Sequence, residues 1–143
     1  MLQGKVAYIT GGTKGIGLGI AKILSQQGIR VAISGRKKED VDNAAAKISG
    51  DSSKVLGIVS NVRNFEDEEN AGSAIKNHFG QLDFVVANAG LGVFKPIDQL
   101  EIEEWNDMID TNLTGVFHTL KASVEELKKS EGYFISISSL AGT

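Results

Sequence analysis

A glycine-rich stretch, Thr10-Gly11-Gly12-Thr13-Lys14-Gly15-Ile16-Gly17, has the clearest chemical capacity in this sequence. It follows an apolar run, Val6-Ala7-Tyr8-Ile9, and precedes a helical pattern. The first turn of a helix has backbone N–H groups without intrahelical acceptors and a partial positive charge. Glycines let the backbone approach an anion closely. The stretch therefore predicts a phosphate-binding turn, although a glycine-rich connection without a ligand could contain the same residues.

Residues 34–38, Ser-Gly-Arg-Lys-Lys, would select the ligand if the phosphates belong to a dinucleotide. An acid at this place would bind a ribose 2′-hydroxyl, but no acid appears before Glu39. A 2′-phosphate needs cations and hydroxyl donors, which Ser34, Arg36 and Lys14 can supply. NADP(H) is therefore favoured over NAD(H). The alternative is that residues 36–38 form a solvated helix start, where cations would oppose the helix dipole.

Strand and helix patterns alternate along the chain and position these residues. Continuous apolar strands alternating with helices predict right-handed βαβ crossovers and a parallel sheet covered on both faces. The predicted fold class is α/β, a three-layer, doubly wound Rossmann sheet that ends after its fifth strand. Residues 1–143 are expected to form one NADP(H)-binding domain. The expected strands are 5–10, 30–34, 54–60, 82–87 and 132–138, and the expected helices are 15–27, 38–48, 64–79, 102–109 and 112–129.

Five short motifs occur in a fixed order along this pattern. They are Thr10-Gly11-x-x-x-Gly15-Ile16-Gly17, Asn61-Val62, Asn88-Ala89-Gly90, Asn112-Leu113-x-Gly115 and Ile137-Ser138-Ser139-x-Ala141-Gly142. With them the chain resembles the N-terminal part of a short-chain dehydrogenase/reductase over residues 2–143. Within that family it resembles bacterial 3-oxoacyl-carrier-protein reductases or glucose dehydrogenases.

The resemblance implies cofactor-binding roles at the matching positions. The glycines of the turn would hold the pyrophosphate, the Asn61-Val62 pair would flank the adenine, and residues 88–90 would shape the floor near the riboses. Family members usually have Asp where Asn61 stands, and Asn keeps an acceptor oxygen without the charge. The expected cofactor-binding residues are Gly11, Thr13, Lys14, Gly15, Ile16, Gly17, Ser34, Arg36, Asn61, Val62, Asn88, Ala89 and Gly90.

The resemblance also implies two catalytic residues, Asn112 and Ser139. Asn112 would hold a water molecule in a proton relay, and Ser139 would polarise a substrate carbonyl for hydride transfer. Taken alone, Asn112 could equally be a helix N-cap, and Ser138 and Ser139 could be a polar strand end. The implied partner is a small-molecule carbonyl or alcohol substrate.

The family's acid–base pair, Tyr-x-x-x-Lys, is not found in this sequence. Tyr8 is followed four residues later by Gly12, and Tyr133 is followed by Ile137. The sequence ends at Thr143, before the helix that would carry the pair. We therefore expect the 143-residue chain to be inactive alone.

Composition excludes several other kinds of function. The net charge of −3 disfavours nucleic acid as the main partner. No apolar run approaches the ~20 residues that span a membrane, and we expect no signal peptide because residues 1–5 lead directly into a strand. Without cysteine there is no disulfide or thiolate chemistry, which fits the cytoplasm. The two histidines lack metal-ligand spacing, so no metal site is expected.

Two functions stay open from the sequence. The first is an oxidoreductase that transfers hydride between NADP(H) and a carbonyl or alcohol substrate. The second is a non-catalytic, truncated NADP(H)-binding or interaction module. In either case the fifth strand would be an open sheet edge and the helix from Asn112 would expose apolar side chains. We therefore expect a homo-oligomer, or a chain that was cut after folding.

Overall fold

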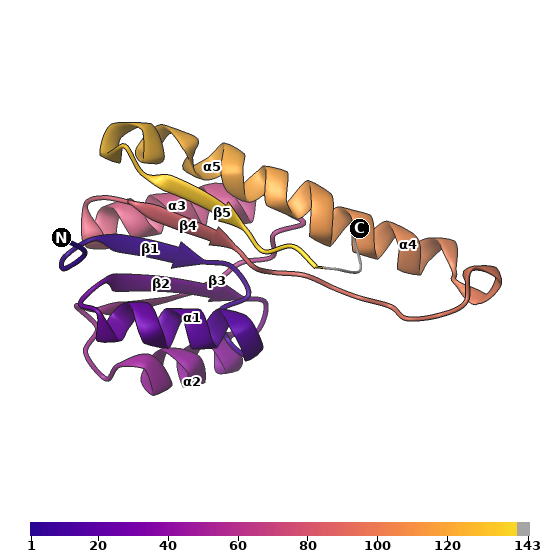
Figure 1. The fold of residues 1–143 in the computed structure, drawn as a ribbon, viewed down its shortest axis with the longest axis horizontal. Coiled ribbons are helices and arrows are strands. Elements are labelled where there is room, and N and C mark those ends of the chain that lie inside the picture. Colours follow the sequence, from indigo (N-terminus) through magenta and orange to yellow (C-terminus); the bar gives the residue numbers. More distant parts are fainter. Residues whose placement is uncertain (140–143) are drawn as a thin grey trace.

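Five parallel strands form the centre of the structure, a computed structural model that describes residues 1–139. Their order is β3-β2-β1-β4-β5, and every neighbouring pair is parallel. The strands therefore end at one common edge (Figure 1), which confirms the predicted Rossmann-like α/β class. The strands are β1 Val6–Ile9, β2 Arg30–Gly35, β3 Val55–Val59, β4 Phe84–Ala87 and β5 Tyr133–Ser136.

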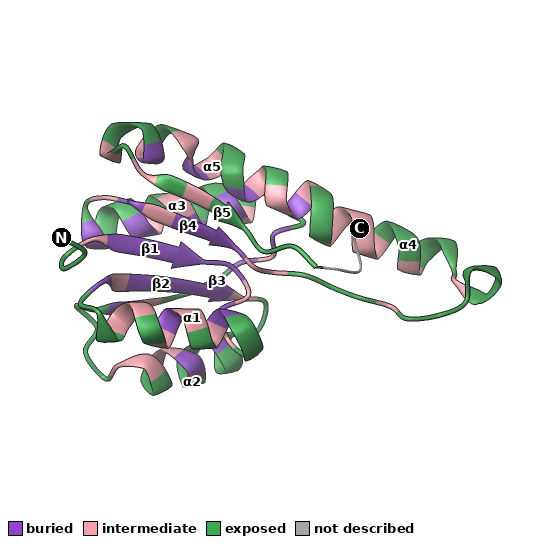
Figure 2. Cartoon of the chain, in the orientation of Figure 1, coloured by how far each residue is buried: buried purple, intermediate pink, exposed green. Residues whose placement is uncertain are grey.

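Helices cover both faces of this sheet. Alternate side chains of a strand point to opposite faces, so Ala7 and Ile9 pack with helices α1 and α2, whereas Val6 and Tyr8 pack with α3 and α5. Figure 2 shows the central strands buried between the two layers and the outer sides of the helices exposed. The helices are α1 Gly15–Gln26, α2 Lys38–Ile48, α3 Phe65–Phe79, α4 Ile102–Ile109 and α5 Gly115–Ser130, with a 3₁₀ turn at Ile97–Gln99.

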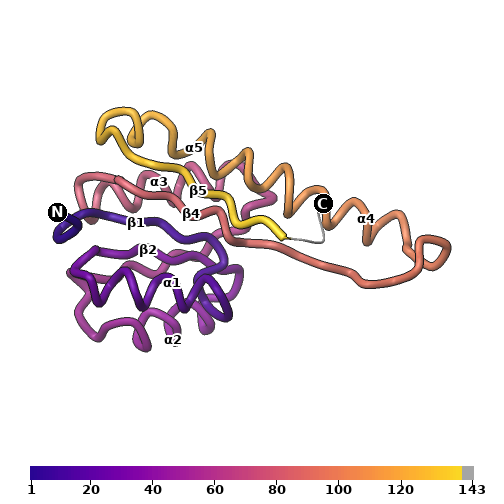
Figure 3. The backbone as a smooth tube through the Cα atoms, in the orientation of Figure 1, coloured from indigo at the N-terminus to yellow at the C-terminus, as the bar shows by residue number. Residues whose placement is uncertain are grey.

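Helices α4 and α5 are joined into one rod by a π-helical segment, Asp110–Thr114. The expectation of a separate helix that begins at Asn112 is therefore wrong. A π turn contains an extra residue and shifts the side-chain stripe, which interrupts the periodicity that a sequence pattern uses. Residues 88–101 run outward from β4 and fold back at the start of this rod (Figure 3).

Close packing at Gly17 sets the position of α1 on the sheet. A Cβ on Gly17 would lie only 2.5 Å from the carbonyl oxygen of Gly11 and would also overlap the Asn88 amide. Gly17 is buried, whereas Gly19, on the same helix, is exposed and would place a Cβ in open space. Close packing therefore requires a glycine at position 17 but not at position 19.

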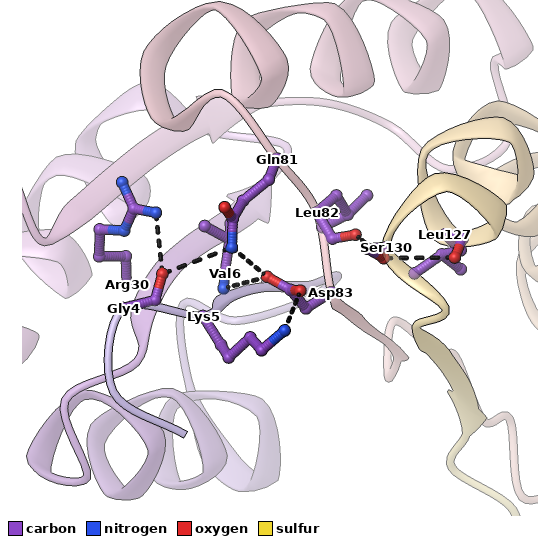
Figure 4. Close-up of polar contacts among 9 residues, drawn as sticks. All are labelled: Gly4, Lys5, Val6, Arg30, Gln81, Leu82, Asp83, Leu127 and Ser130. Carbon is purple, nitrogen blue, oxygen red and sulfur yellow. Dashed lines mark hydrogen bonds and ion pairs between the residues drawn. The ribbon is translucent and has the colours of Figure 1, made fainter. Parts of the chain in front are cut away.

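A cluster around Asp83 joins the amino ends of the strands (Figure 4). The carboxylate accepts hydrogen bonds from the Val6 N–H at 2.9 Å, from Lys5 at 3.0 Å and from Gln81 at 2.7 Å. Burial raises the pKa of Asp83, but the bonds from Val6, Lys5 and Gln81 outweigh it and leave that pKa below its ordinary value. Ser130, at the end of α5, donates to the carbonyl of Leu82 at 2.7 Å. This end of the sheet is therefore fixed by polar contacts.

Substitution of the two glycines should change stability in opposite directions. Gly17→Ala should lower the free energy of unfolding by about 1–3 kcal/mol because the new methyl group overlaps the glycine turn. Gly19→Ala should raise it by about 0.5–1 kcal/mol because alanine favours the helix. Urea denaturation of both variants measures this difference, and equal effects would contradict the packing described for Gly17.

Loss of the Asp83 carboxylate should lower the free energy of unfolding and make it depend less on pH in acid. Because the folded-state pKa is lowered, this group stabilises the fold above its unfolded-state pKa, about 4, and that contribution is lost as the pH falls through the folded-state pKa. Asp83→Asn should cost about 2–3 kcal/mol at pH 7 and flatten the fall in stability below about pH 4. The control is Asp42→Asn, an exposed partner of Lys38. An acid denaturation curve for Asp83→Asn parallel to the parent curve would contradict this assignment.

Candidate functional site

The predicted site residues of the sheet gather at its carboxyl edge. In a doubly wound sheet this edge, next to the reversal of strand order, is where ligands bind. The reversal lies between β1 and β4. The residues that reach this edge are the glycine turn after β1, Ser34 and Arg36 at the end of β2, Asn61 and Val62 after β3, residues 88–90 after β4, and Ser139 after β5.

The glycine turn adopts a backbone that needs glycine at two positions. Gly11 has φ +63° and Gly15 has φ +55°, both in the left-handed region. A Cβ on Gly11 would also lie 2.9 Å from the Cα of Ala89, whereas a Cβ on Gly15 would meet nothing within 4 Å. Gly11 therefore lets two loops touch, and Gly15, the first residue of α1, leaves open space at the start of that helix.

The start of α1 differs from the starts of α2, α3 and α4. Lys14 is its N-cap and makes no side-chain capping bond, and its first turn contains no acid. By contrast, α2 has two acids in its first turn, α3 has an asparagine cap and three acids, and α4 has a capping box. The N–H groups and positive dipole end of α1 thus have no anionic side chain of their own helix, which suits an external anion.

Asn88 fixes the glycine turn to the end of β4. Its amide Nδ2 donates to the carbonyls of Thr10 and Gly11, both at 3.1 Å. The Thr10 hydroxyl accepts from the N–H groups of Asn88 at 3.0 Å and Ala89 at 3.1 Å. Asn88 therefore shapes the site through the turn that it holds. Thr10 was not among the predicted site residues, although its place at the end of a buried strand was visible in the sequence.

The Ser34 hydroxyl, predicted as a phosphate ligand, lies in the interior and not on the surface of this edge. Ser34 is 1% exposed, and its hydroxyl lies 3.0 Å from that of Tyr8. The phenol of Tyr8 also donates to Oε1 of Glu68 at 2.9 Å, and Ser60 donates to the same oxygen at 2.6 Å. Oε2 of Glu68 is buried and has no hydrogen-bond partner among the described residues. Ser34 belongs to this internal cluster because its side chain points into the sheet–α3 layer.

Arg36 and Lys14 lie exposed on the surface at this edge. Neither makes an ion pair or hydrogen bond with another side chain of residues 1–139, whereas Lys38 is paired with Asp42 at 2.7 Å. Arg36 and Lys14 thus remain available to a ligand beside the turn. Thr13 packs over Gly35, because a Cβ added to Gly35 would lie 2.5 Å from the methyl group of Thr13.

The loop after β3 is held from several sides. The Asn61 N–H donates to Asp67 at 2.9 Å, and its side-chain oxygen accepts from the Arg63 N–H at 3.1 Å. Val62 is 6% exposed, and a Cβ on Gly115 would lie 2.7 Å from its side chain. A contact of Val62 with a ligand would therefore come from its main chain.

Asn112 lies inside the π-helical segment, so the alternative that it caps a helix is wrong. Its side chain accepts from the N–H of Leu91 at 2.8 Å and donates to the carbonyl of Leu91 at 2.7 Å. One lone pair of Oδ1 and one N–H of Nδ2 remain available. Asn112 therefore ties the rod to the loop after β4. Ser139 is exposed at the same edge, and Ala141 and Gly142 of its motif lie outside the described residues.

Neither tyrosine of the chain is placed for acid–base chemistry at this edge. Burial and the nearby Glu68 carboxylate raise the pKa of the Tyr8 phenol well above its ordinary value, so it stays a donor in the core. Tyr133 begins β5 at the opposite edge, where its ring stacks on Phe84 at 6.3 Å. Within residues 1–139, no group of three His, Cys, Asp or Glu side chains could hold a metal ion. Over the same range, no helix has both the length and the apolar character to cross a membrane.

Comparisons with known proteins agree with this architecture. The family model described as short chain dehydrogenase matches residues 5–143. An uncharacterized oxidoreductase of Staphylococcus aureus (strain MW2) is 36% identical over 143 residues, which are 99% of this chain and 61% of that protein. A second from Staphylococcus epidermidis is 36% identical over 139 residues, 96% of this chain and 59% of that protein. The chain thus spans about three fifths of the length of these relatives.

Solved structures place the same fold in the first part of longer chains. An alcohol dehydrogenase from Thermococcus sibiricus, complexed with 5-hydroxy-NADP, has a TM-score of 0.87 and 37% identity over 92% of this chain and 57% of its own. The 3-ketoacyl-(acyl-carrier-protein) reductase of Brucella melitensis, complexed with NADH, has a TM-score of 0.90 and 28% identity over 97% and 59%. With the matched family model and the geometry of the carboxyl edge, these findings establish that the chain belongs to the short-chain dehydrogenase/reductase family.

Proposed function

We propose that this chain is the cofactor-binding part of an oxidoreductase that transfers hydride between NADP(H) and a small carbonyl or alcohol compound. The observation that carries the proposal is the start of α1, which has no capping side chain and no acid in its first turn. The open space beside Gly15 adjoins this helix start. A diphosphate fits there because its charge would meet the helix dipole and unpaired N–H groups.

The remaining cofactor contacts follow the loops of the same edge. The turn at Gly11, Gly15 and Gly17 would hold the pyrophosphate, together with the first N–H groups of α1. The Asn61 side chain and the Val62 main chain would meet the adenine. Residues 88–90 would support the riboses, held in place by the bonds between Asn88 and Thr10.

The preference for NADP(H) rests on the residues of this chain, since one similar structure contains 5-hydroxy-NADP and another contains NADH. Arg36 and Lys14 are exposed cations without a side-chain partner among the described residues. A carboxylate that could bind a 2′-hydroxyl is absent from residues 34–38. Arg36 and Lys14 can therefore bind the 2′-phosphate without the help of Ser34.

For catalysis, the bound cofactor would supply or accept the hydride. Ser139 would donate a hydrogen bond to the substrate oxygen and stabilise the charge that develops on it. Asn112 would hold the loop at Leu91 and, with its remaining hydrogen-bonding groups, a water molecule. The family's Tyr-x-x-x-Lys pair is not among the residues of this chain, so we propose that the 143-residue chain binds cofactor without turnover.

Apolar side chains on the surface of the α4–α5 rod support a homo-oligomer. Leu113 is 65% exposed, Phe117 is 57% exposed and Leu120 is 38% exposed. The edge strand β5 also presents Tyr133 and Ile135 to solvent. Burial of such surfaces against another copy would remove apolar area from water.

Because the chain contains no cysteine, we place the proposed enzyme in the cytoplasm.

Replacement of Arg36 should remove the preference for NADP(H). We expect Arg36→Ala to weaken NADP⁺ binding by about tenfold, the effect of one charge-assisted hydrogen bond, and to leave NAD⁺ binding unchanged within about twofold. Lys38→Ala is the control because Lys38 is paired with Asp42. Isothermal titration calorimetry measures both ligands. Equal binding of NAD⁺ and NADP⁺ by the parent chain would contradict the proposed preference.

A charge on the exposed face of α5 should separate the copies. Phe117→Glu would place a carboxylate among apolar side chains that the proposed interface buries. Light scattering coupled to size-exclusion chromatography should find an oligomer for the parent chain and a monomer for the variant. A parent chain that stays monomeric at high concentration would rule out the proposed assembly.

A further inference from the structure

His118, on α5, makes a hydrogen bond that fixes the loop after β3. Its ring nitrogen Nδ1 lies 2.7 Å from the carbonyl oxygen of Val62. A carbonyl oxygen only accepts hydrogen bonds, so Nδ1 carries the proton and donates it. The same carbonyl belongs to the residue whose main chain would meet the adenine.

Two more contacts tie this loop to the α4–α5 rod. The side chain of Val62 packs against Gly115, one turn before His118, where a Cβ would lie 2.7 Å away. Arg63 is paired with Asp107 at 2.9 Å and with Asp110 at 3.4 Å. The rod therefore holds Val62 by both its main chain and its side chain, and it also holds the next residue, Arg63.

The ring of His118 has a defined orientation. Phe65, the first residue of α3, lies beside it with ring centroids 5.6 Å apart. Asn61 and Val62 lie between α3 and the rod, and the Asn61 N–H is bound to Asp67 of α3. His118 thus occupies the place where α3, the rod and the loop meet.

We propose that His118 is a positioning residue for the adenine end of the cofactor. Its Nδ1–H holds the Val62 carbonyl so that the Asn61 side chain and the Val62 N–H stay aimed at the adenine. The inference rests on the proposed cofactor function but adds a residue that would not touch the cofactor. With His118 in this role, the rod that carries Asn112 also controls the affinity for the adenosine half of the cofactor.

The test compares two half-ligands, 5′-AMP and nicotinamide mononucleotide, by chemical-shift titration of the 143-residue chain. His118→Leu removes the donor at similar volume, and we expect AMP binding to weaken about three- to tenfold with no change for nicotinamide mononucleotide. His118→Asn should restore AMP binding because its amide nitrogen stands where Nδ1 stands. His78→Leu is the matched control: that histidine also contacts a carbonyl, of Ser52 at 2.8 Å, but lies at the far end of α3.

A merely structural role would lower the thermal midpoint and weaken both half-ligands alike, and that result would overturn the proposal. AMP binding by His118→Leu equal to that of the parent chain would also overturn it while leaving the proposed function intact. A parent chain that binds neither half-ligand would instead reject the proposed function, and this inference with it.

If His118→Leu does not fold, the variant Arg63→Met tests the same proposal, because it removes the ion pairs that hold the same loop to the rod. AMP binding should then weaken about two- to threefold. Unchanged AMP binding would overturn the proposal.

Discussion

The pairing of β1 with β4 is the contact on which the candidate site depends. These strands are distant in sequence, and their parallel alignment brings Ile9 beside Val86. The segments that follow these two strands are joined by hydrogen bonds of the Thr10 hydroxyl and the Asn88 amide. Because Gly11 and Gly17 have no side chains, α1 can approach this junction closely. The helix start that would meet a phosphate is therefore placed by contacts that involve no ligand.

The α4–α5 rod holds the two outer parts of the same edge. Asn112 binds the main chain of Leu91 through both of its side-chain groups, and His118 binds the main chain of Val62. The loops after β4 and β3 are thus fixed by residues one and a half turns apart on one element. A surface that would serve assembly, at Phe117, adjoins these positions on the rod.

Much of the fold was predictable because its local signals agree. The order of strands and helices followed from apolar periodicity, and Gly80 ends α3 in the left-handed conformation that a glycine stop favours. The joined rod was not predictable, because the π segment breaks the regular helical repeat. The described motif residues that follow a strand were found at the expected edge, because parallel strands end at one edge of the sheet. Asn112 follows no strand and lies on the rod.

Side-chain direction was the part of the site that the sequence did not contain. Ser34 has the residue type and place of a phosphate ligand, yet its hydroxyl joins Tyr8 and Glu68 in the core. Asn88 and Asn112 have amides that bind the protein's own main chain. His118 gave no motif at all, because its partner Val62 lies 56 residues away and is reached only through the fold.

NADP(H) bound at the start of α1 would change the environment of the carboxyl edge of this sheet and leave the opposite edge unchanged. The most direct measurement is a titration of the ¹⁵N-labelled chain with NADP⁺, followed by amide chemical shifts. We expect the largest shifts in residues 11–17, with smaller ones at Asn61, Val62 and residues 88–90. Shifts confined to the opposite edge, around Asp83, or no saturable shifts at all, would contradict binding at the start of α1.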